Sequence, residues 1–278
     1  SSIVASSLPL HQKYGGIIPE IASRSHMETI VLVVKEALSK SRHSLTDIDA
    51  VSVTNNPGLI GSLLVGISFA RAISFALNKP LLGVDHVQSH LYANFLNGRS
   101  PGLPAIGLVV SGGHTSIYYL KDLQTCRLIG WTVDDAAGEA FDKVAKILNL
   151  GYPGGPIIDK LARKGNPKKI RFSCSAFADS LNFSFSGVKT AVLYYVRDKW
   201  DKKKVRLEDI AASFQEAVVN NLVAQALRAC KTKRVKNLII GGGVAANSRL
   251  REVLTNTAKR QKVKVFFRFV GNHRFSKP

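Results

Sequence analysis

Two histidines, His86 and His90, stand four residues apart in a stretch whose residue pattern predicts a helix. Residues at positions i and i+4 lie on one face of a helix about one turn apart, so both imidazoles could bind the same metal ion. Asp85 or Gln88 could orient one of these ligands through a hydrogen bond. Two histidines do not complete a metal site, and a pair of surface or capping histidines is the alternative interpretation.

Two glycine-rich turns could receive a phosphorylated ligand. Ser111-Gly112-Gly113-His114-Thr115 separates two β-rich runs and offers unobstructed backbone N–H groups, with hydroxyls and an imidazole at the rim. An ordinary hairpin turn is the alternative. Residues 241–247 follow a predicted strand and precede a predicted helix, the layout of a phosphate-binding turn, but lack the spaced G-x-G-x-x-G of dinucleotide sites. Asp142 could cap a helix or accept a hydrogen bond from a ribose hydroxyl.

Nucleophilic catalysis finds no support in the sequence. There is no G-x-S-x-G motif, and none of the three cysteines, Cys126, Cys174 and Cys230, has a His-rich or Gly-rich setting. Their odd number and wide spacing, without a C-x-x-C pair, argue against a disulfide framework or a structural zinc site. We therefore expect a reducing compartment.

The elements that must position these residues alternate between helix and strand. In the first part we expect a helix over 21–40, a strand over 49–54, a buried helix over 59–77, a strand over 80–84 and a helix over 86–96. This order predicts a parallel or mixed α/β sheet. We then expect strands over 105–110 and 115–120, helices over 133–149, 157–164 and from 187 to 200, an amphipathic helix over 207–230, a strand over 237–240 and a helix over 245–260. Asp134 and Asp135 are expected in the first turn of the 133–149 helix, where the helix dipole favours carboxylates.

The charge is distributed unevenly along the 278 residues. Residues 1–139 contain 10 basic and 10 acidic side chains, whereas residues 140–278 contain 29 and 9, so the whole formal net charge of +20 belongs to the second half. Such a half is expected to meet a polyanion, and its basic runs at 160–171, 197–206, 228–236 and 259–264 are candidate phosphate contacts. The 45% hydrophobic content excludes intrinsic disorder. No uninterrupted apolar stretch of roughly 20 residues and no signal peptide is evident, so we expect a soluble, intracellular protein without a membrane partner.

Eight ordered motifs extend over nearly the whole chain. They are Tyr14-Gly15-Gly16-Ile17-Ile18-Pro19-Glu20-Ile21-Ala22-Ser23-Arg24-Ser25-His26, Asn56-Pro57-Gly58-Leu59-Ile60-Gly61-Ser62-Leu63, His86-Val87-Gln88-Ser89-His90, Val110-Ser111-Gly112-Gly113-His114-Thr115, Asp134-Asp135-Ala136-Ala137-Gly138-Glu139-Ala140-Phe141-Asp142-Lys143, Tyr152-Pro153-Gly154-Gly155-Pro156, Phe183-Ser184-Phe185-Ser186-Gly187 and Gly241-Gly242-Gly243-Val244-Ala245-Ala246-Asn247. Together they closely resemble the TsaD-type tRNA threonylcarbamoyladenosine transferases, a family of the actin-like, sugar-kinase and heat-shock-protein ATPase superfamily.

The resemblance implies an α/β protein of two lobes, residues 1–98 and a nucleotide-binding, basic lobe over 99–278, with mixed sheets flanked by helices. It implies transfer of a threonylcarbamoyl group from threonylcarbamoyl-adenylate to N6 of the adenosine 3′ of the anticodon, in tRNAs that read codons beginning with A. By the same resemblance His86 and His90 would bind Fe²⁺ or Zn²⁺, which would polarise the carbamoyl group. The adenylate would contact Val109, Val110, Ser111, Gly112, Gly113, Asp142, Gly155, Asp159 and Asn247.

The chain departs from the family pattern at both ends. The family's opening strands with their phosphate loop, and its third metal ligand, an aspartate beyond the glycine run, are not found, and no Asp or Glu follows Glu252. We therefore expect both lobes to be incomplete and metal binding to be weak; the chain is either a fragment of an active enzyme or a short, non-catalytic nucleotide-binding paralogue. A general nucleic-acid-binding protein would have no use for the motifs. The family implies a paralogous actin-like subunit and a small ATPase subunit as partners, and the bacterial cytoplasm, or else a mitochondrial or plastid matrix, as the compartment.

Overall fold

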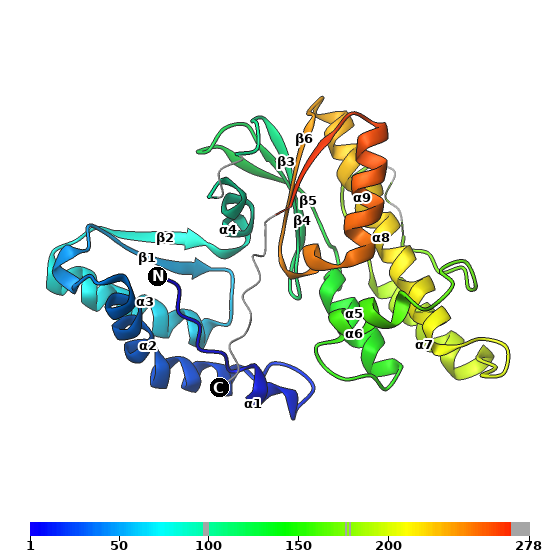
Figure 1. The fold of residues 1–278 in the computed structure, drawn as a ribbon, viewed down its shortest axis with the longest axis horizontal. Helices are drawn as coiled ribbons and strands as arrows, with labels where there is room; N and C mark the ends of the chain where they lie inside the picture. Colours follow the sequence, from blue (N-terminus) through cyan, green and yellow to red (C-terminus); the bar gives the residue numbers. More distant parts are fainter. Residues whose placement is uncertain (97–99, 176, 178, 268–278) are drawn as a thin grey trace. The chain divides into compact units, whose positions relative to one another are not determined.

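The computed structural model describes residues 1–96, 100–175, 177 and 179–267. The chain forms two compact units, Ser1–Ser89 and His90–Pro278 (Figure 1). The lobe boundary expected between residues 98 and 99, and the basic residues after 267, lie outside the described residues. The mixed α/β class predicted from the sequence is confirmed.

The first unit is built on a two-stranded parallel sheet of β1 (Val51–Asn56) and β2 (Leu81–Asp85). The short α1 (Leu8–Gln12) and the long α2 (Pro19–Ser41) precede the sheet, with the 3-10 helix η1 (Leu45–Asp47) between α2 and β1. α3 (Ile60–Leu77) connects the strands and packs on both of them and on α2. Proline fits the first turn of α2 because it lacks the N–H that would have no partner there.

The expected burial of the 59–77 helix is wrong. Ala70 is the buried residue of α3, and Phe75 is 90% exposed. The physical reason is that two strands and one helix cover a single stripe of an apolar helix. By length and composition α3 is also the helix, within the described part of the chain, that could cross a membrane. Its packing on β1 and α2 is that of a helix laid on a sheet, and one such helix is weak evidence for a span.

The second unit contains a five-stranded sheet in the order β5-β4-β3-β6-β7. β3 (Ala105–Val110), β4 (Thr115–Leu120) and β5 (Cys126–Trp131) are antiparallel, whereas β6 (Asn237–Gly241) and β7 (Lys264–Phe267) run parallel to β3. The predicted 105–110 and 115–120 hairpin is confirmed, with Val110 opposite Thr115. Because β3 and β6 are parallel neighbours, the turns that follow them lie at the same edge of the sheet.

Helices surround this sheet and supply most of the buried core. α4 (His86–Tyr92) and the 3-10 helix η2 (Ala93–Phe95) precede the sheet; α5 (Ala137–Ile147), α6 (Gly154–Ala162), α7 (Ser186–Tyr194) and the π-helix η3 (Tyr195–Lys199) follow β5. α8 (Leu207–Thr232) packs on α6, α9 and the sheet, and the 3-10 helix η4 (Gly243–Ala246) leads from β6 into α9 (Ser248–Arg260). The rings of Phe141 and Phe214 meet edge to face at 5.1 Å and join α5 to α8.

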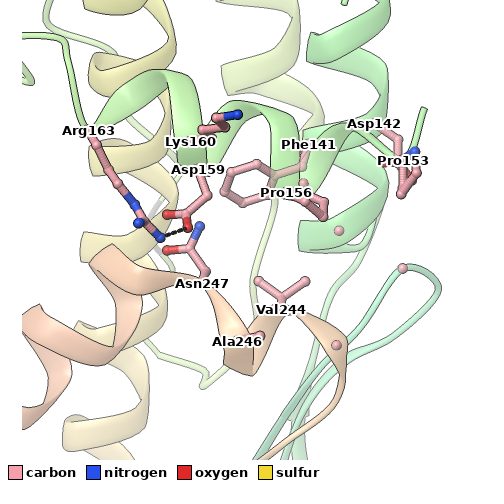
Figure 2. Close-up of a pocket in the computed structure, with 14 residues that line it drawn as sticks. Phe141, Asp142, Pro153, Pro156, Asp159, Lys160, Arg163, Val244, Ala246 and Asn247 are labelled. Carbon is pink, nitrogen blue, oxygen red and sulfur yellow. Dashed lines mark hydrogen bonds and ion pairs between the residues drawn. The ribbon is translucent and has the colours of Figure 1, made fainter. Parts of the chain in front are cut away.

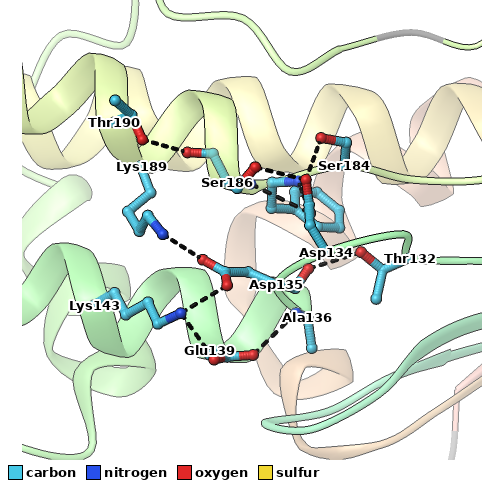
Figure 3. A network of polar contacts seen from close by, with 11 residues as sticks. Thr132, Asp134, Asp135, Ala136, Glu139, Lys143, Ser184, Ser186, Lys189 and Thr190 are labelled. Atoms are coloured by element: carbon cyan, nitrogen blue, oxygen red, sulfur yellow. Dashed lines mark hydrogen bonds and ion pairs between the residues drawn. The ribbon is translucent and has the colours of Figure 1, made fainter.

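The expected place of Asp134 and Asp135 in a first helical turn is wrong, because α5 begins only at Ala137 (Figure 3). Asp134 instead accepts hydrogen bonds from the Ser184 and Ser186 hydroxyls, both at 2.6 Å, and from the Phe185 amide at 2.8 Å. It therefore caps α7, about fifty residues away in the chain. Asp135 pairs with two lysines, Lys143 of α5 and Lys189 of α7. The two aspartates thus tie α5 to α7.

Candidate nucleotide-binding site

A pocket of about 610 Å³ opens in the second unit at the carboxyl edge of β3 and β6 (Figure 2). It lies among the first turns of α5 and α6 and the residues after β6. This is the place where open α/β sheets bind their ligands. Its lining consists of Gly112, Gly138, Phe141, Asp142, Pro153, Gly155, Pro156, Asp159, Lys160, Arg163, Gly243, Val244, Ala246 and Asn247.

Several helix N-termini meet at this pocket. Gly138 belongs to the first turn of α5, Gly155 to the first turn of α6, and Asn247 is the N-cap of α9. The N–H groups of a first turn have no partner within their helix and stand at the positive end of the helix dipole, so such ends attract anions. The lining has two basic side chains, Lys160 and Arg163, and two acidic ones, Asp142 and Asp159, and Arg163 is paired with Asp159. A phosphate group would therefore meet the helix ends and Lys160, beside the two carboxylates.

Another part of the pocket lining is apolar. Phe141, Pro153, Pro156 and Val244 present apolar surface to the cavity (Figure 2). Phe141 is only 1% exposed and is held by its contact with Phe214, so this wall belongs to the core. An apolar wall beside polar helix ends fits a ligand with a flat ring at one end and an anion at the other.

Asp142 holds the start of α6 against the pocket. Its Oδ1 accepts a hydrogen bond of 2.7 Å from the backbone N–H of Gly154, twelve residues later. Burial raises the pKa of Asp142, while hydrogen bonds from Gly154 and Gly155 act in the opposite direction. The capping role proposed from the sequence is confirmed. The carboxylate of Asp142 has further lone pairs, so it can also accept a hydrogen bond from a ribose hydroxyl.

Asp159 and Asn247 are positioned by bonds to the start of α9. Asp159 Oδ1 accepts from the Ser248 hydroxyl at 2.7 Å, and its Oδ2 accepts from Arg163 Nη2 at 2.9 Å. Asn247 Oδ1 accepts from the Leu250 amide at 2.9 Å, and its Nδ2 donates to Gln215 Oε1 at 2.7 Å. Both side chains are buried and fixed. One amide hydrogen of Asn247 and the remaining carboxylate lone pairs of Asp159 are available for a ligand.

The residues expected around the β3–β4 turn divide into two groups. Gly112 lines the pocket, whereas Val109 and Val110 are fully buried in β3, and Ser111 and the exposed Gly113 do not line it. The Ser111 hydroxyl accepts from the His114 amide at 3.0 Å.

The hydroxyls expected at the rim of this turn therefore serve the fold. The buried Thr115 hydroxyl accepts from the Ala137 amide at 2.9 Å, at the start of α5, and the Ser111 carbonyl accepts from the Gly138 amide. Of the nine residues that the resemblance implies, the structure brings together Gly112, Asp142, Gly155, Asp159 and Asn247.

Of the remaining lining residues, Gly243, Val244 and Ala246 lie in the predicted phosphate-binding turn, and Lys160 and Arg163 lie in a predicted basic run. Gly138, Phe141, Pro153 and Pro156 were not predicted as site residues. One signal could have found part of this set: Pro156, Asp159, Lys160 and Arg163 recur at the three- and four-residue intervals of a single helix face. The face of α6 that carries Asp159 thus also carries the basic side chains.

The two histidines lie one turn apart in α4, as their spacing predicts. Asp85 caps this helix, since its Oδ1 accepts from the Gln88 amide at 2.8 Å, and its Oδ2 accepts from Asn56. Within residues 1–96, 100–175, 177 and 179–267, no group of three His, Cys, Asp or Glu side chains could hold a metal ion. His86 and His90 are thus two candidate donors without a third among these residues.

Two of the three thiols, those of Cys174 and Cys230, are poor nucleophiles. Burial raises the pKa of Cys174 and of Cys230 to about 12, so both are protonated at neutral pH. This agrees with the absence of a nucleophilic motif in the sequence.

Comparison with known proteins identifies the family. The family model described as TsaD, tRNA N6-adenosine threonylcarbamoyltransferase, matches residues 1–269. The chain belongs to this family. Relatives named tRNA N6-adenosine threonylcarbamoyltransferase include one from Clostridium kluyveri, 50% identical over 96% of this chain and 79% of its own length, and one from Clostridium botulinum, 49% identical over 95% and 78%.

Two solved HypF structures share the fold. One, described as full-length HypF in the phosphate- and nucleotide-bound form, has a TM-score of 0.62 at 14% identity and covers 88% of this chain. The other, T. kodakarensis HypF, has a TM-score of 0.66 at 14% identity and covers 86%. This chain spans 46% and 40% of those proteins. The actin-like ATPase architecture expected from the sequence is confirmed.

Proposed function

We propose that this chain is an acyltransferase that moves the threonylcarbamoyl group from threonylcarbamoyl-adenylate to N6 of the adenosine 3′ of the anticodon, in tRNAs that read codons beginning with A. Family membership over residues 1–269 supports the reaction. The observation that carries the proposal for this chain is the pocket, which combines three helix N-termini, the lysine Lys160, hydrogen-bonding carboxylates and an amide, and an apolar wall. A nucleoside monophosphate ester has the complementary chemistry.

In this proposal the nucleoside of the adenylate lies against Phe141 and Pro156. Asp142, Asp159 and Asn247 accept or donate hydrogen bonds to its ribose and base, and Gly112 and Gly155 allow the backbone to approach closely. The structure supports these roles by placing all five polar and glycine residues at one pocket. Val109, Val110, Ser111 and Gly113 act by shaping the turn that carries Gly112.

The transfer requires one bond to form and one to break. The N6 amine attacks the carbamoyl carbon, the bond from that carbon to the phosphate oxygen breaks, and AMP leaves with the electron pair while the amine loses a proton to solvent. Negative charge grows on the leaving phosphate, which the helix N-termini and Lys160 would stabilise, whereas Arg163 is paired with Asp159. A helix end contributes about 0.3–1 kcal/mol, and up to about 2 kcal/mol when partly buried.

We further propose that His86 and His90 bind one divalent metal ion, Fe²⁺ or Zn²⁺, as two of its ligands. Their position one turn apart in α4 supports this, because imidazoles on one helix face can reach a common ion. A bound metal would act as a Lewis acid on the carbamoyl group.

The proposed macromolecular partners are tRNA, a paralogous actin-like subunit and a small ATPase subunit, without a membrane partner. The charge of the second half supports tRNA as a partner, since residues 140–278 contain 29 basic and only 9 acidic side chains. The clostridial relatives support the bacterial cytoplasm as the compartment, with an organelle matrix as the alternative.

A second candidate is a non-catalytic nucleotide-binding paralogue of the same fold. A transfer assay separates the two. Purified chain is incubated with threonylcarbamoyl-adenylate and unmodified tRNA, with and without the partner subunits, and the modified nucleoside and AMP are quantified by mass spectrometry. Equal amounts of modified adenosine and AMP are expected. AMP binding without any modified adenosine, even with the partners present, would support the paralogue and contradict the transferase.

A further inference from the structure

A second depression lies on the outer face of α6, beside the nucleotide pocket. It measures about 430 Å³ and is lined by Leu150, Pro156, Ile157, Lys160, Leu161 and Lys164. We call it the α6 groove. Pro156 and Lys160 line both the groove and the nucleotide pocket, so the two are adjacent.

The α6 groove has an apolar floor and a cationic rim. Ile157 and Leu161 are half-buried, one turn apart on α6, and Lys160 and Lys164 are exposed at the same spacing. Neither lysine forms an ion pair within the described part of the chain, although the nearby Arg163 pairs with Asp159. Such a groove is complementary to an occupant that is flat and apolar at its centre and anionic at its edge.

We propose that the α6 groove holds an anticodon-loop nucleotide adjacent to the reacting adenosine, its base on Ile157 and Leu161 and its phosphate near Lys164. Single-stranded nucleotides are recognised in this way, with unstacked bases laid on side chains and phosphates met by cations. The proposal rests on the transferase function above, because it assumes that the reacting adenosine meets the bound adenylate at the mouth of the neighbouring pocket.

The size of the groove favours a nucleotide over a protein. A specific protein interface buries at least about 1,000 Å² in total, whereas the groove is lined by six residues. The net positive charge of this half of the chain also favours RNA. A protein partner is therefore treated as an outcome of the test.

The test measures binding of an anticodon stem–loop RNA to the full chain over a range of salt concentrations. Lys164→Ala is expected to lower the affinity and to reduce the slope of log K against log salt by about 0.7–0.9, the loss of one phosphate contact. AMP affinity should not change, because Lys164 does not line the nucleotide pocket. Lys121→Ala is the matched control. Lys121 is an exposed lysine that follows β4, and it lies roughly 20 Å along the strand from Thr115, which is at the pocket end of β4.

The base is tested with Ile157→Ala and stem–loops that lack the base on either side of the reacting adenosine. Ile157→Ala should weaken binding about 3- to 30-fold by loss of apolar contact. For one of the two abasic RNAs this loss should vanish, because the two changes remove the same contact. Thermal melting shows whether Ile157→Ala folds; Lys164→Ala, at an exposed position, keeps the proposal testable if it does not.

Three results would overturn the groove assignment. The first is an equal change of RNA affinity in Lys121→Ala and Lys164→Ala. The second is an Ile157→Ala loss of affinity that is undiminished with both abasic RNAs. The third is unchanged RNA affinity in both groove variants together with weaker binding of a partner subunit. Failure of the transferase function is distinct, since it appears as absence of modified adenosine with the wild-type chain.

Discussion

Gly154 and Gly155 are adjacent at the start of α6, yet replacing each by alanine should have opposite consequences. A Cβ at Gly155 would meet nothing within 4 Å, and Gly155 lines the pocket, so the methyl group occupies ligand space. A Cβ at Gly154 would lie 2.5 Å from the Ala145 Cβ and 2.8 Å from the Phe141 carbonyl oxygen. The first glycine thus serves helix packing and the second serves the ligand.

The magnitudes follow from these contacts. Overfilling a well-fitted space costs about 1–3 kcal/mol, so Gly155→Ala should weaken AMP binding about 5- to 150-fold. It should leave stability unchanged or raise it by up to about 1 kcal/mol, because alanine favours helix more than glycine does. Gly154→Ala should lower stability by about 1–3 kcal/mol, which corresponds to a Tm lower by about 2–12 °C for a unit of this size.

Two measurements on each variant test this reasoning. Isothermal titration with AMP gives the affinity, and circular dichroism melting gives the Tm. Wild-type AMP affinity in Gly155→Ala would refute the assignment of the pocket as the adenylate site. An unchanged Tm in Gly154→Ala would refute the packing argument for α5 and α6.

Three further predictions concern other parts of the chain. Burial alone would raise the pKa of Asp134, but hydrogen bonds from Ser184, Ser186 and Phe185 lower it overall, so its contribution to stability is complete above about pH 4 and is lost as pH falls through the lowered folded pKa. Asp134→Asn should therefore lose about 1–3 kcal/mol in urea unfolding at pH 7 and less at pH 3; an equal loss at both would contradict the cap. Zn²⁺ or Fe²⁺ should bind weakly, and a tight one-to-one titration abolished by His86→Ala would contradict the incomplete donor set. Affinity for tRNA should fall steeply between 50 and about 200 mM salt, whereas a flat response would exclude phosphate contacts by the basic runs.

Local sequence patterns predicted the positions of helices and strands better than the contacts between them. Alternation and periodicity located β3, β4, α2 and α8, because these signals lie within single segments. The start of α5 was misplaced because Asp134 caps a helix about fifty residues away and Asp135 pairs with Lys143 and Lys189. β5 was not anticipated, although its pairing with β4 completes the antiparallel edge of the sheet.

The candidate site depended on the same distinction. Asp142, Asp159 and Asn247 come from three separate segments, so spacing alone could not bring them together; the family resemblance did. Ser111 and Thr115 have the residue types of a ligand-binding rim, but their hydroxyls hold the turn and the start of α5. Hydroxyls have the same appearance in a sequence whether they bind a ligand or the backbone.

The most direct test of the adenylate site is hydrogen–deuterium exchange of the full chain with and without a non-hydrolysable threonylcarbamoyl-adenylate analogue. The pocket predicts slower exchange in peptides that cover 153–157 and 243–250, the starts of α6 and α9, and no change in Gly155→Ala at the same analogue concentration. Protection that falls elsewhere, or no protection at saturating analogue, would contradict the central claim.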